Sequence, residues 1–189
     1  MIAKIQGCVM DSKVVDPIVV PNTAAVIVMG VSGCGKSTIG ALLAHRLSWE
    51  FQDGDWFHPP ENVEKMHNGT PLTDDDRMPW LQAIAARIDE LRRGGTQEVI
   101  ACSALKKRYR DILVADYPDV QLVYLKGDQD LIGHRISLRQ EHFMPAALLQ
   151  SQFATLEEPV QTERPIVVDV DGTPADIVTS IIAALAEKR

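Results

Sequence analysis

The sequence has 189 residues, of which 46% are hydrophobic and 24% are charged, so it is long enough for one well-buried domain and too short for two of ordinary size. A formal net charge of −7 argues against a nucleic-acid-binding protein, although a local basic cluster still permits an anionic substrate. Cys8, Cys34 and Cys102 form neither an even disulfide framework nor a CxxC metal pattern, which favours a reducing, cytoplasmic compartment.

The first 22 residues are predicted to be an extension, to which no role is assigned. Lysines and aspartates interrupt each apolar run of MIAKIQGCVMDSKVVDPIVVPN, so the stretch is neither a signal peptide nor a membrane anchor. We therefore expect no membrane partner and a single globular domain over residues 23–189.

From residue 24 onward, apolar runs alternate with segments of helical period, the pattern of a parallel sheet covered by helices. The run AAVIVM is apolar throughout, which favours a central strand buried on both faces. Five strands are predicted, over residues 24–29, 49–53, 98–102, 121–126 and 165–170.

Helices are predicted between the strands from apolar spacing and from start and stop signals. One begins at Lys36, and a short one lies between Pro60 and Gly69. The run DDDRMPW opens a longer helix that ends at Gly94, with the acids and Pro79 placed in its first turn. Further helices are expected over residues 104–115, about 128–139, 145–156 and from residue 173 onward.

The stretch GVSGCGKS at residues 30–37 fits G-x-x-x-x-G-K-[ST], the phosphate-binding loop. A strand runs into it and a helix leaves it, as the mechanism of the motif requires. Glycines turn successive N–H groups toward one anion, Lys36 reaches the β and γ phosphates, and the Ser37 hydroxyl is offered to Mg²⁺. The alternative is an ordinary glycine-rich turn. The predicted ATP-binding residues of the loop are Gly30, Val31, Ser32, Gly33, Cys34, Gly35, Lys36, Ser37 and Thr38.

A phosphate loop alone establishes only nucleotide binding, so the class of protein has to come from other motifs. The sequence has no guanine-reading NKxD and no LSGGQ-like pattern, and its DxxG match at residues 169–172 lies in the fifth predicted strand. These observations leave a compact kinase that phosphorylates a small acceptor.

Asp53 and Asp55 close the second predicted strand and are candidates for the acceptor side of such a kinase. The attacking hydroxyl needs an oriented base and Mg²⁺ needs oxygen ligands. If the stretch is extended, the two carboxylates point to opposite faces and take separate roles. The alternative is a solvated acidic turn.

Several blocks together closely resemble gluconate kinase, also called gluconokinase: GVSGCGKST, DGDWFHPPENVEKM, PLTDDDRMPWL, CSALKKRYRDIL, VYLKGD and HFMPAALLQSQFATLEEP. The match runs from about residue 25 to the C-terminus. The resemblance implies an α/β protein with the P-loop three-layer α/β/α fold, a five-stranded parallel sheet and a helical lid, similar to shikimate kinase. It also implies transfer of the γ phosphate of ATP to the 6-hydroxyl of D-gluconate with Mg²⁺, usually by a homodimer.

On this resemblance, residues 53–80 form the acceptor side of the site, a helical flap over a polyhydroxylated acid. Asp55 is expected to hold the attacking hydroxyl and Asp53 to lie nearer Mg²⁺, although the two roles are exchangeable. His58 is expected to donate to a gluconate hydroxyl or to the carboxylate. Arg77 is expected to pair with that carboxylate, because a guanidinium offers two parallel donors.

Neighbouring polar residues of this segment have plainer interpretations. At least two of the acids at residues 74–76 are expected to cap the helix that they open. His67 and Trp80 are expected to be packing or surface residues.

The loop after the third strand should also line the site, because loops at strand C-termini do so in doubly wound sheets. Ser103 and Lys106 are therefore candidates for contact with the acceptor, and Arg110 is a further one. The alternative is a solvated basic helix face. No acid ends this strand, where many phosphate-loop ATPases hold Mg²⁺, and this makes Asp53 harder to replace.

A lid over about residues 130–145 is expected to close on the phosphates. Arg135 and Arg139 lie one helical turn apart and are expected to neutralise charge on the transferred group, with His142 assisting. The alternative is a salt-bridged surface helix. DVDGTP, after the last strand, is expected beside the adenine.

Two rival functions remain open from the sequence. One is a kinase of another small sugar acid or of a shikimate-like hydroxy acid, since one polar contact can change specificity by orders of magnitude. The other is a nucleotide-binding regulator without catalysis. The joint presence of Lys36, Ser37, Asp53, Asp55 and Arg139 argues against the regulator.

Overall fold

The computed structural model describes residues 20–138 and 146–187, apart from the side chains of 146–148. A five-stranded sheet, parallel at every pairing, runs through this part of the chain in the order β2-β3-β1-β4-β5. The predicted α/β architecture with a five-stranded parallel sheet is therefore confirmed. The strands are β1 (Ala25–Met29), β2 (Glu50–Asp53), β3 (Glu98–Ala101), β4 (Val120–Lys126) and β5 (Ile166–Asp169).

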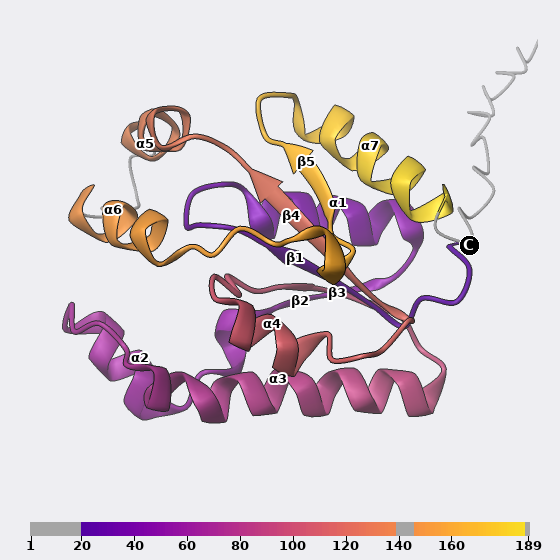
Figure 1. Ribbon diagram of the computed structural model, residues 1–189, viewed down its shortest axis with the longest axis horizontal. Coiled ribbons are helices and arrows are strands. Elements are labelled where there is room, and N and C mark those ends of the chain that lie inside the picture. Colours follow the sequence, from indigo (N-terminus) through magenta and orange to yellow (C-terminus); the bar gives the residue numbers. More distant parts are fainter. Residues whose placement is uncertain (1–19, 139–145, 188–189) are drawn as a thin grey trace, which may run out of the picture.

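Helices cover both faces of the sheet, and Figure 1 shows the resulting three layers. α1 and α7 lie on one face, α3 and α4 on the other, and α2, α5 and α6 gather at one end of the molecule. The helices are α1 (Lys36–Leu47), α2 (Pro60–His67), α3 (Asp74–Gly94), α4 (Lys107–Leu113), α5 (Gln129–Ser137), α6 (Ala146–Thr155) and α7 (Pro174–Glu187), with short 3₁₀ helices η1 (Gly54–Phe57) and η2 (Gln161–Glu163).

The central strand β1 joins two apolar cores because all five of its residues are buried. Val26 belongs to a cluster with Leu43 of α1 and Ile181 of α7. Ile27 belongs to the cluster on the opposite face, with Ile84 of α3. Successive strand side chains point to opposite faces, so a strand that is apolar at every position is the one that lies between two helical layers.

Two details of the predicted helices are wrong. The helix expected over residues 104–115 begins only at Lys107, because Ala104 has a φ of +43° and the carbonyls of Ala104 and Leu105 accept from Arg110. Pro79 lies inside α3 rather than in its first turn, because Thr73 caps the helix and Asp74 begins it.

The predicted extension, residues 1–22, lies mostly outside the described residues. Within its described end, Val20 is buried against the core that also holds α1 and α7. No helix in the described part of the chain is both long and apolar enough to cross a bilayer.

Candidate active site

The phosphate loop connects β1 to α1, as its motif predicts. Gly33 and Gly35 have φ values of +83° and +103°, which side-chain-bearing residues rarely adopt. A Cβ at Gly33 would also lie 2.6 Å from Cδ1 of Ile136 in α5, so the loop and this helix are in close contact. The glycines thus permit both the turn of the loop and the approach of α5.

Lys36 and Cys34 take different places in this loop. Lys36 begins α1, and its Nζ donates to the carbonyl of Val31 at 3.1 Å, so its ammonium lies folded over the loop. Cys34 is buried, and burial raises the pKa of its thiol. A buried neutral thiol behaves as a small apolar side chain.

Ser37 and Asp53 meet at the junction of the loop and the acceptor segment. The Ser37 hydroxyl donates to Oδ2 of Asp53 at 2.7 Å, across 16 positions of sequence. Hydroxyl and carboxylate oxygens are the ligands that Mg²⁺ prefers, and this ion commonly binds one or two protein groups together with substrate phosphates. The pair therefore fits a magnesium ion bound to a nucleotide.

The turn Asp53–Gly54–Asp55 is tightly held. Asp53 caps η1 by accepting from the backbone N–H of Asp55 at 3.1 Å. Gly54 lies against the carbonyl of Ala101 in β3, leaving no room for a Cβ, and its own carbonyl accepts from Nε1 of Trp80 at 2.7 Å. The chain therefore turns at Gly54, and the alternation of side chains expected of an extended stretch does not apply. The two carboxylates still take different positions, because Asp53 ends a strand and Asp55 lies in a 3₁₀ helix.

His58 lies beside this turn with one unsatisfied ring nitrogen. Its ring stacks on Trp80 with centroids 4.4 Å apart, and Trp80 is 2% exposed, so the packing role expected for Trp80 agrees with its position. Nδ1 of His58 is buried with no hydrogen-bond partner among the described residues. Burial lowers the pKa of His58, Asp55 partly opposes this, and Arg77 adds to it. A neutral imidazole with a free polar atom is suited to a hydroxylated ligand.

Arg77 lies at the N-terminus of α3. Its Nη1 donates to the carbonyls of Leu72 and, at 3.2 Å, Thr73. Asp76 completes a capping box with Thr73, whereas Asp74 is engaged elsewhere. Within the described residues, Asp76 is thus the acid that bonds the N-cap residue. We expected at least two of the acids at residues 74–76 to cap this helix, and the structure supports that role for Asp76.

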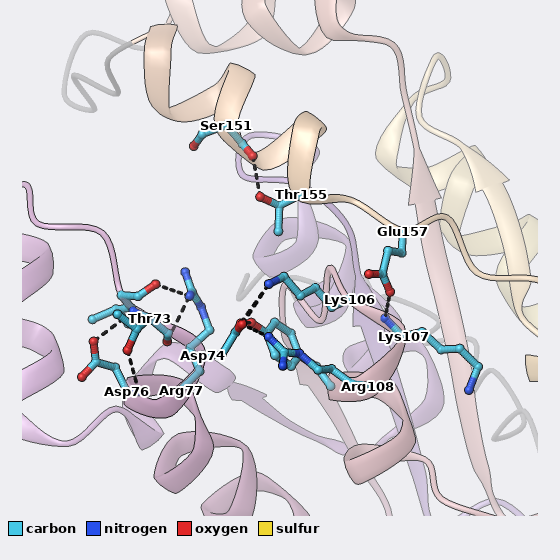
Figure 2. Close-up of polar contacts among 12 residues, drawn as sticks. Thr73, Asp74, Asp76, Arg77, Lys106, Lys107, Arg108, Ser151, Thr155 and Glu157 are labelled. Carbon is cyan, nitrogen blue, oxygen red and sulfur yellow. Dashed lines mark hydrogen bonds and ion pairs between the residues drawn. The ribbon is translucent and has the colours of Figure 1, made fainter.

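Asp74 forms the centre of a basic cluster that joins α3 to the loop after β3. Lys106 donates to both of its oxygens, at 2.9 and 3.1 Å, and Arg108 and Tyr109 also contact its carboxylate. Figure 2 shows Lys106 and Arg108 pointing toward Asp74 from α4 and its N-cap. Ser103 lies nearby in the chain, and its carbonyl accepts from the N–H of Gly30 at 3.4 Å, which ties this loop to the phosphate loop.

Arg110 does not face an acceptor. Its side chain is 2% exposed and forms a bidentate pair with Glu163, at 2.6 and 3.0 Å, besides its bonds to the carbonyls that precede α4. Burial opposes ionisation of Glu163, but the bonds from Arg110 and from the N–H of Val160, with the positive charge of Arg110 and Lys107, together outweigh it and lower the pKa of that carboxyl. Arg110 is therefore a buried structural residue, and this candidate is set aside.

The lid residues are only partly described. Arg135 in α5 donates to the carbonyl of Val170, after β5, at 2.6 Å. Arg139 and His142 lie outside the described residues. His67, at the end of α2, is exposed as expected.

Sequence reasoning missed the residues that connect the site across long separations. The backbone N–H of Ser32 donates to Oε1 of Gln152 at 2.6 Å, although 120 positions separate them. Glu157 accepts from the backbone N–H of Lys107 at 2.6 Å, and Figure 2 shows the two side by side. Gln152 and Glu157 both lie in the block HFMPAALLQSQFATLEEP, which carried the family resemblance but gave no role for either side chain.

Comparison with known proteins agrees with this geometry. The family model for shikimate kinase matches residues 32–186. The thermoresistant gluconokinase of Escherichia coli is 45% identical over 164 residues, covering 86% of this chain and 94% of that protein. A probable gluconokinase of Mus musculus is 46% identical, covering 84% of this chain and 96% of that protein.

Solved structures agree as well. A gluconokinase from Sinorhizobium meliloti superimposes with a TM-score of 0.78 at 45% identity, covering 86% of this chain and 91% of that one. Identity of about 45% over more than four fifths of the chain, with the phosphate loop and the acidic turn together, leaves one conclusion: the chain belongs to the gluconokinase family of shikimate-kinase-like, ATP-dependent kinases.

Proposed function

We propose that this protein transfers the γ-phosphoryl group of ATP to the 6-hydroxyl of D-gluconate, giving 6-phospho-D-gluconate and ADP. The single observation that carries the proposal is the 2.7 Å contact between Ser37 and Asp53, because it brings the acceptor turn against the phosphate loop. The relatives named gluconokinase supply the identity of the acceptor.

In the proposed reaction, the 6-oxygen attacks the γ phosphorus while Asp55 accepts the hydroxyl proton. The bond from the γ phosphorus to the bridging oxygen breaks, and ADP leaves. Lys36 and the N–H groups of the loop hold the phosphates, where their fixed positive charge favours the spread of negative charge in transfer. Asp55 is exposed, and its N–H bonds to Asp53, which accepts from Ser37 of the loop. Its carboxylate is therefore available near the expected γ phosphate, where such a base is needed.

Ser37 and Asp53 are the residues that would hold Mg²⁺. When bound, the ion neutralises phosphate charge and aligns the triphosphate. Asp53 is positioned for this by its two bonds, one to the Ser37 hydroxyl and one to the N–H of Asp55.

Gluconate is proposed to lie between η1, the N-terminus of α3 and the loop after β3. His58 offers a buried, unsatisfied nitrogen to a hydroxyl. Arg77 and Lys106 supply positive charge for the carboxylate, and Ser103 is a further candidate contact. Because Asp74 already pairs with Lys106, the carboxylate of the substrate would share this ammonium or displace Asp74 from it.

The lid is proposed to bring Arg135, Arg139 and His142 toward the phosphates or the acceptor. The contact of Ile136 with Gly33 supports this, because it places α5 against the phosphate loop. Residues 23–189 are proposed to form one kinase domain that works in the cytoplasm as a homodimer.

A coupled assay that follows ADP release tests the proposed function. Purified protein should turn over with gluconate and give much lower kcat/KM with shikimate, glycerate and nucleoside monophosphates. Turnover with another sugar acid but none with gluconate would move the assignment to that acid. No turnover with any acceptor, despite ATP binding, would favour the non-catalytic regulator.

A further inference from the structure

The helix α6 is anchored at several points, which makes the position of Gln152 specific. Leu149 is buried in the core that holds α1 and α7, and Phe153, four residues later, packs against the same core. Beyond the helix, the N–H of Glu157 donates to the carbonyl of Leu105 at 2.9 Å. Gln152 therefore projects from a helix that is held in place, and this fixes the position from which its side chain contacts the phosphate loop.

The contact with Ser32 fixes the orientation of the Gln152 amide. A backbone N–H only donates, so the side-chain oxygen has to face Ser32, at 2.6 Å. Nε2 then carries two donor hydrogens directed away from Ser32. Within residues 20–138 and 146–187, Nε2 has no hydrogen-bond acceptor. It is also not among the buried atoms without a partner, so a ligand can reach it.

The position of Lys36 indicates which phosphate is expected near Ser32. In this motif the lysine reaches the β and γ phosphates. Lys36 rests its Nζ at 3.1 Å from the carbonyl of Val31, the residue directly before Ser32. The two Nε2 hydrogens of Gln152, which have no acceptor within the described parts of the chain, thus lie where the last phosphate of a triphosphate is expected.

We propose that Gln152 is a γ-phosphate-binding residue supplied from outside the phosphate loop. Its oxygen stays on the N–H of Ser32, and Nε2 donates to an oxygen of the terminal phosphate. The contact distinguishes ATP from ADP, because a diphosphate does not reach it. The inference rests on the proposed phosphoryl transfer, but it concerns the nucleotide alone.

The same segment links the nucleotide to the acceptor loop. Gln152 contacts the phosphate loop, and five residues later Glu157 holds the N–H that opens α4, next to Lys106. α6 ends at Thr155, so the first contact is made from its last turn and the second from just beyond the helix.

Binding of ADP and of a non-hydrolysable ATP analogue, measured by calorimetry without acceptor, tests the assignment. Gln152→Met keeps the side-chain length and removes the amide. It should weaken the ATP analogue about ten- to a hundredfold, the size of one hydrogen bond to a charged group, and leave ADP unchanged. Gln82→Met, on the exposed face of α3, is the matched control and should change neither.

Gln152→Glu keeps an oxygen for Ser32 but faces the phosphate with a second anion. It should lose more affinity for the ATP analogue than Gln152→Met does. If thermal unfolding shows that Gln152→Met has not folded, Gln152→Glu tests the role of Gln152 in its place. Equal losses for ADP and the analogue, or none for either, would overturn the inference. Failure of wild-type protein to phosphorylate gluconate, with this discrimination intact, would instead refute only the proposed acceptor.

Discussion

At the scale of single residues, the site depends on Asp53 and Asp55 having different surroundings. Asp53 is tied to Ser37 and to the N–H of Asp55, so both of its oxygens have protein partners. Asp55 is exposed on η1, and its carboxylate remains available to an acceptor hydroxyl. These different surroundings are the reason that we propose a metal-binding role for Asp53 and a proton-accepting role for Asp55.

Replacing Asp55 by Asn removes the proposed base but keeps the shape of the side chain. We expect kcat to fall about 10²- to 10⁴-fold, the usual contribution of general base catalysis. Stability should change little, because the side chain is exposed. Steady-state kinetics and thermal unfolding measure the two effects, with the exposed Asp116→Asn as control; near-normal turnover in Asp55→Asn would remove the residue from this role.

The lowered pKa of His58 leads us to expect that the stability of the protein depends on pH, and it also gives the sign of that dependence. The unfolded chain takes up a proton near the ordinary value of 6.5, whereas the folded protein resists protonation to a lower pH. Below 6.5 the unfolded state therefore binds more protons, and the free energy of unfolding decreases as pH falls through this window.

Urea unfolding between pH 7.5 and pH 5.5 checks this dependence. His58→Gln, which has no titrating ring, should lose less stability over this range than the wild type does. Parallel pH profiles for the two proteins would contradict the lowered pKa.

At the scale of elements, η1 is fixed between β3 and α3. Gly54 touches the carbonyl of Ala101 and accepts from Trp80, so the acidic turn has a strand on one side and a helix on the other. A methyl group at residue 54 would push the turn off β3 and separate Asp53 from Ser37. Gly54→Ala should therefore lower both stability and kcat.

The loss of kcat is expected for Gly54 and not for every glycine. Gly94→Ala, at the C-terminus of α3, is the control, because a Cβ there meets only the flexible end of Thr96. Gly94→Ala should leave kcat unchanged. Wild-type activity in Gly54→Ala would show that the turn tolerates displacement.

The pair of Arg110 and Glu163 fixes the start of α4. Arg110→Met leaves Glu163 without its buried partner, and we expect a loss of about 3–5 kcal/mol in the free energy of unfolding. The matched control is Lys107→Met, which breaks a pair with Asp111 whose side chains are about half exposed and should cost less than about 1 kcal/mol. Chemical denaturation measures the loss of stability in both variants. At a temperature where Arg110→Met is folded, its KM for gluconate should be unchanged. A raised KM with unchanged stability would return Arg110 to the acceptor site.

At the scale of the whole molecule, the sheet order places three loops together. β2, β3 and β1 are neighbours and parallel, so the acidic turn, the loop of Ser103 and the phosphate loop leave the same edge of the sheet. Ligands bind at this edge in open α/β sheets. The fold therefore assembles the site from segments that are far apart in the sequence.

The sequence was sufficient for features with a local cause. Apolar runs predicted the strands, and the spacing of glycines, Lys36 and Ser37 predicted the phosphate loop, because both depend on nearby residues. The contacts of Asp74, Arg110 and Gln152 could not be predicted in this way. Each joins residues 32 to 120 positions apart, and which partner a charged or amide side chain finds depends on how the helices pack.

A crystal structure with gluconate and a non-hydrolysable ATP analogue tests the central claim most directly. We predict that the triphosphate lies on the loop of residues 30–37, with the 6-hydroxyl of gluconate within hydrogen-bonding distance of Asp55 and directed at the γ phosphate. Gluconate bound at another edge of the sheet, or with its carboxylate rather than its 6-hydroxyl facing the phosphate, would contradict it.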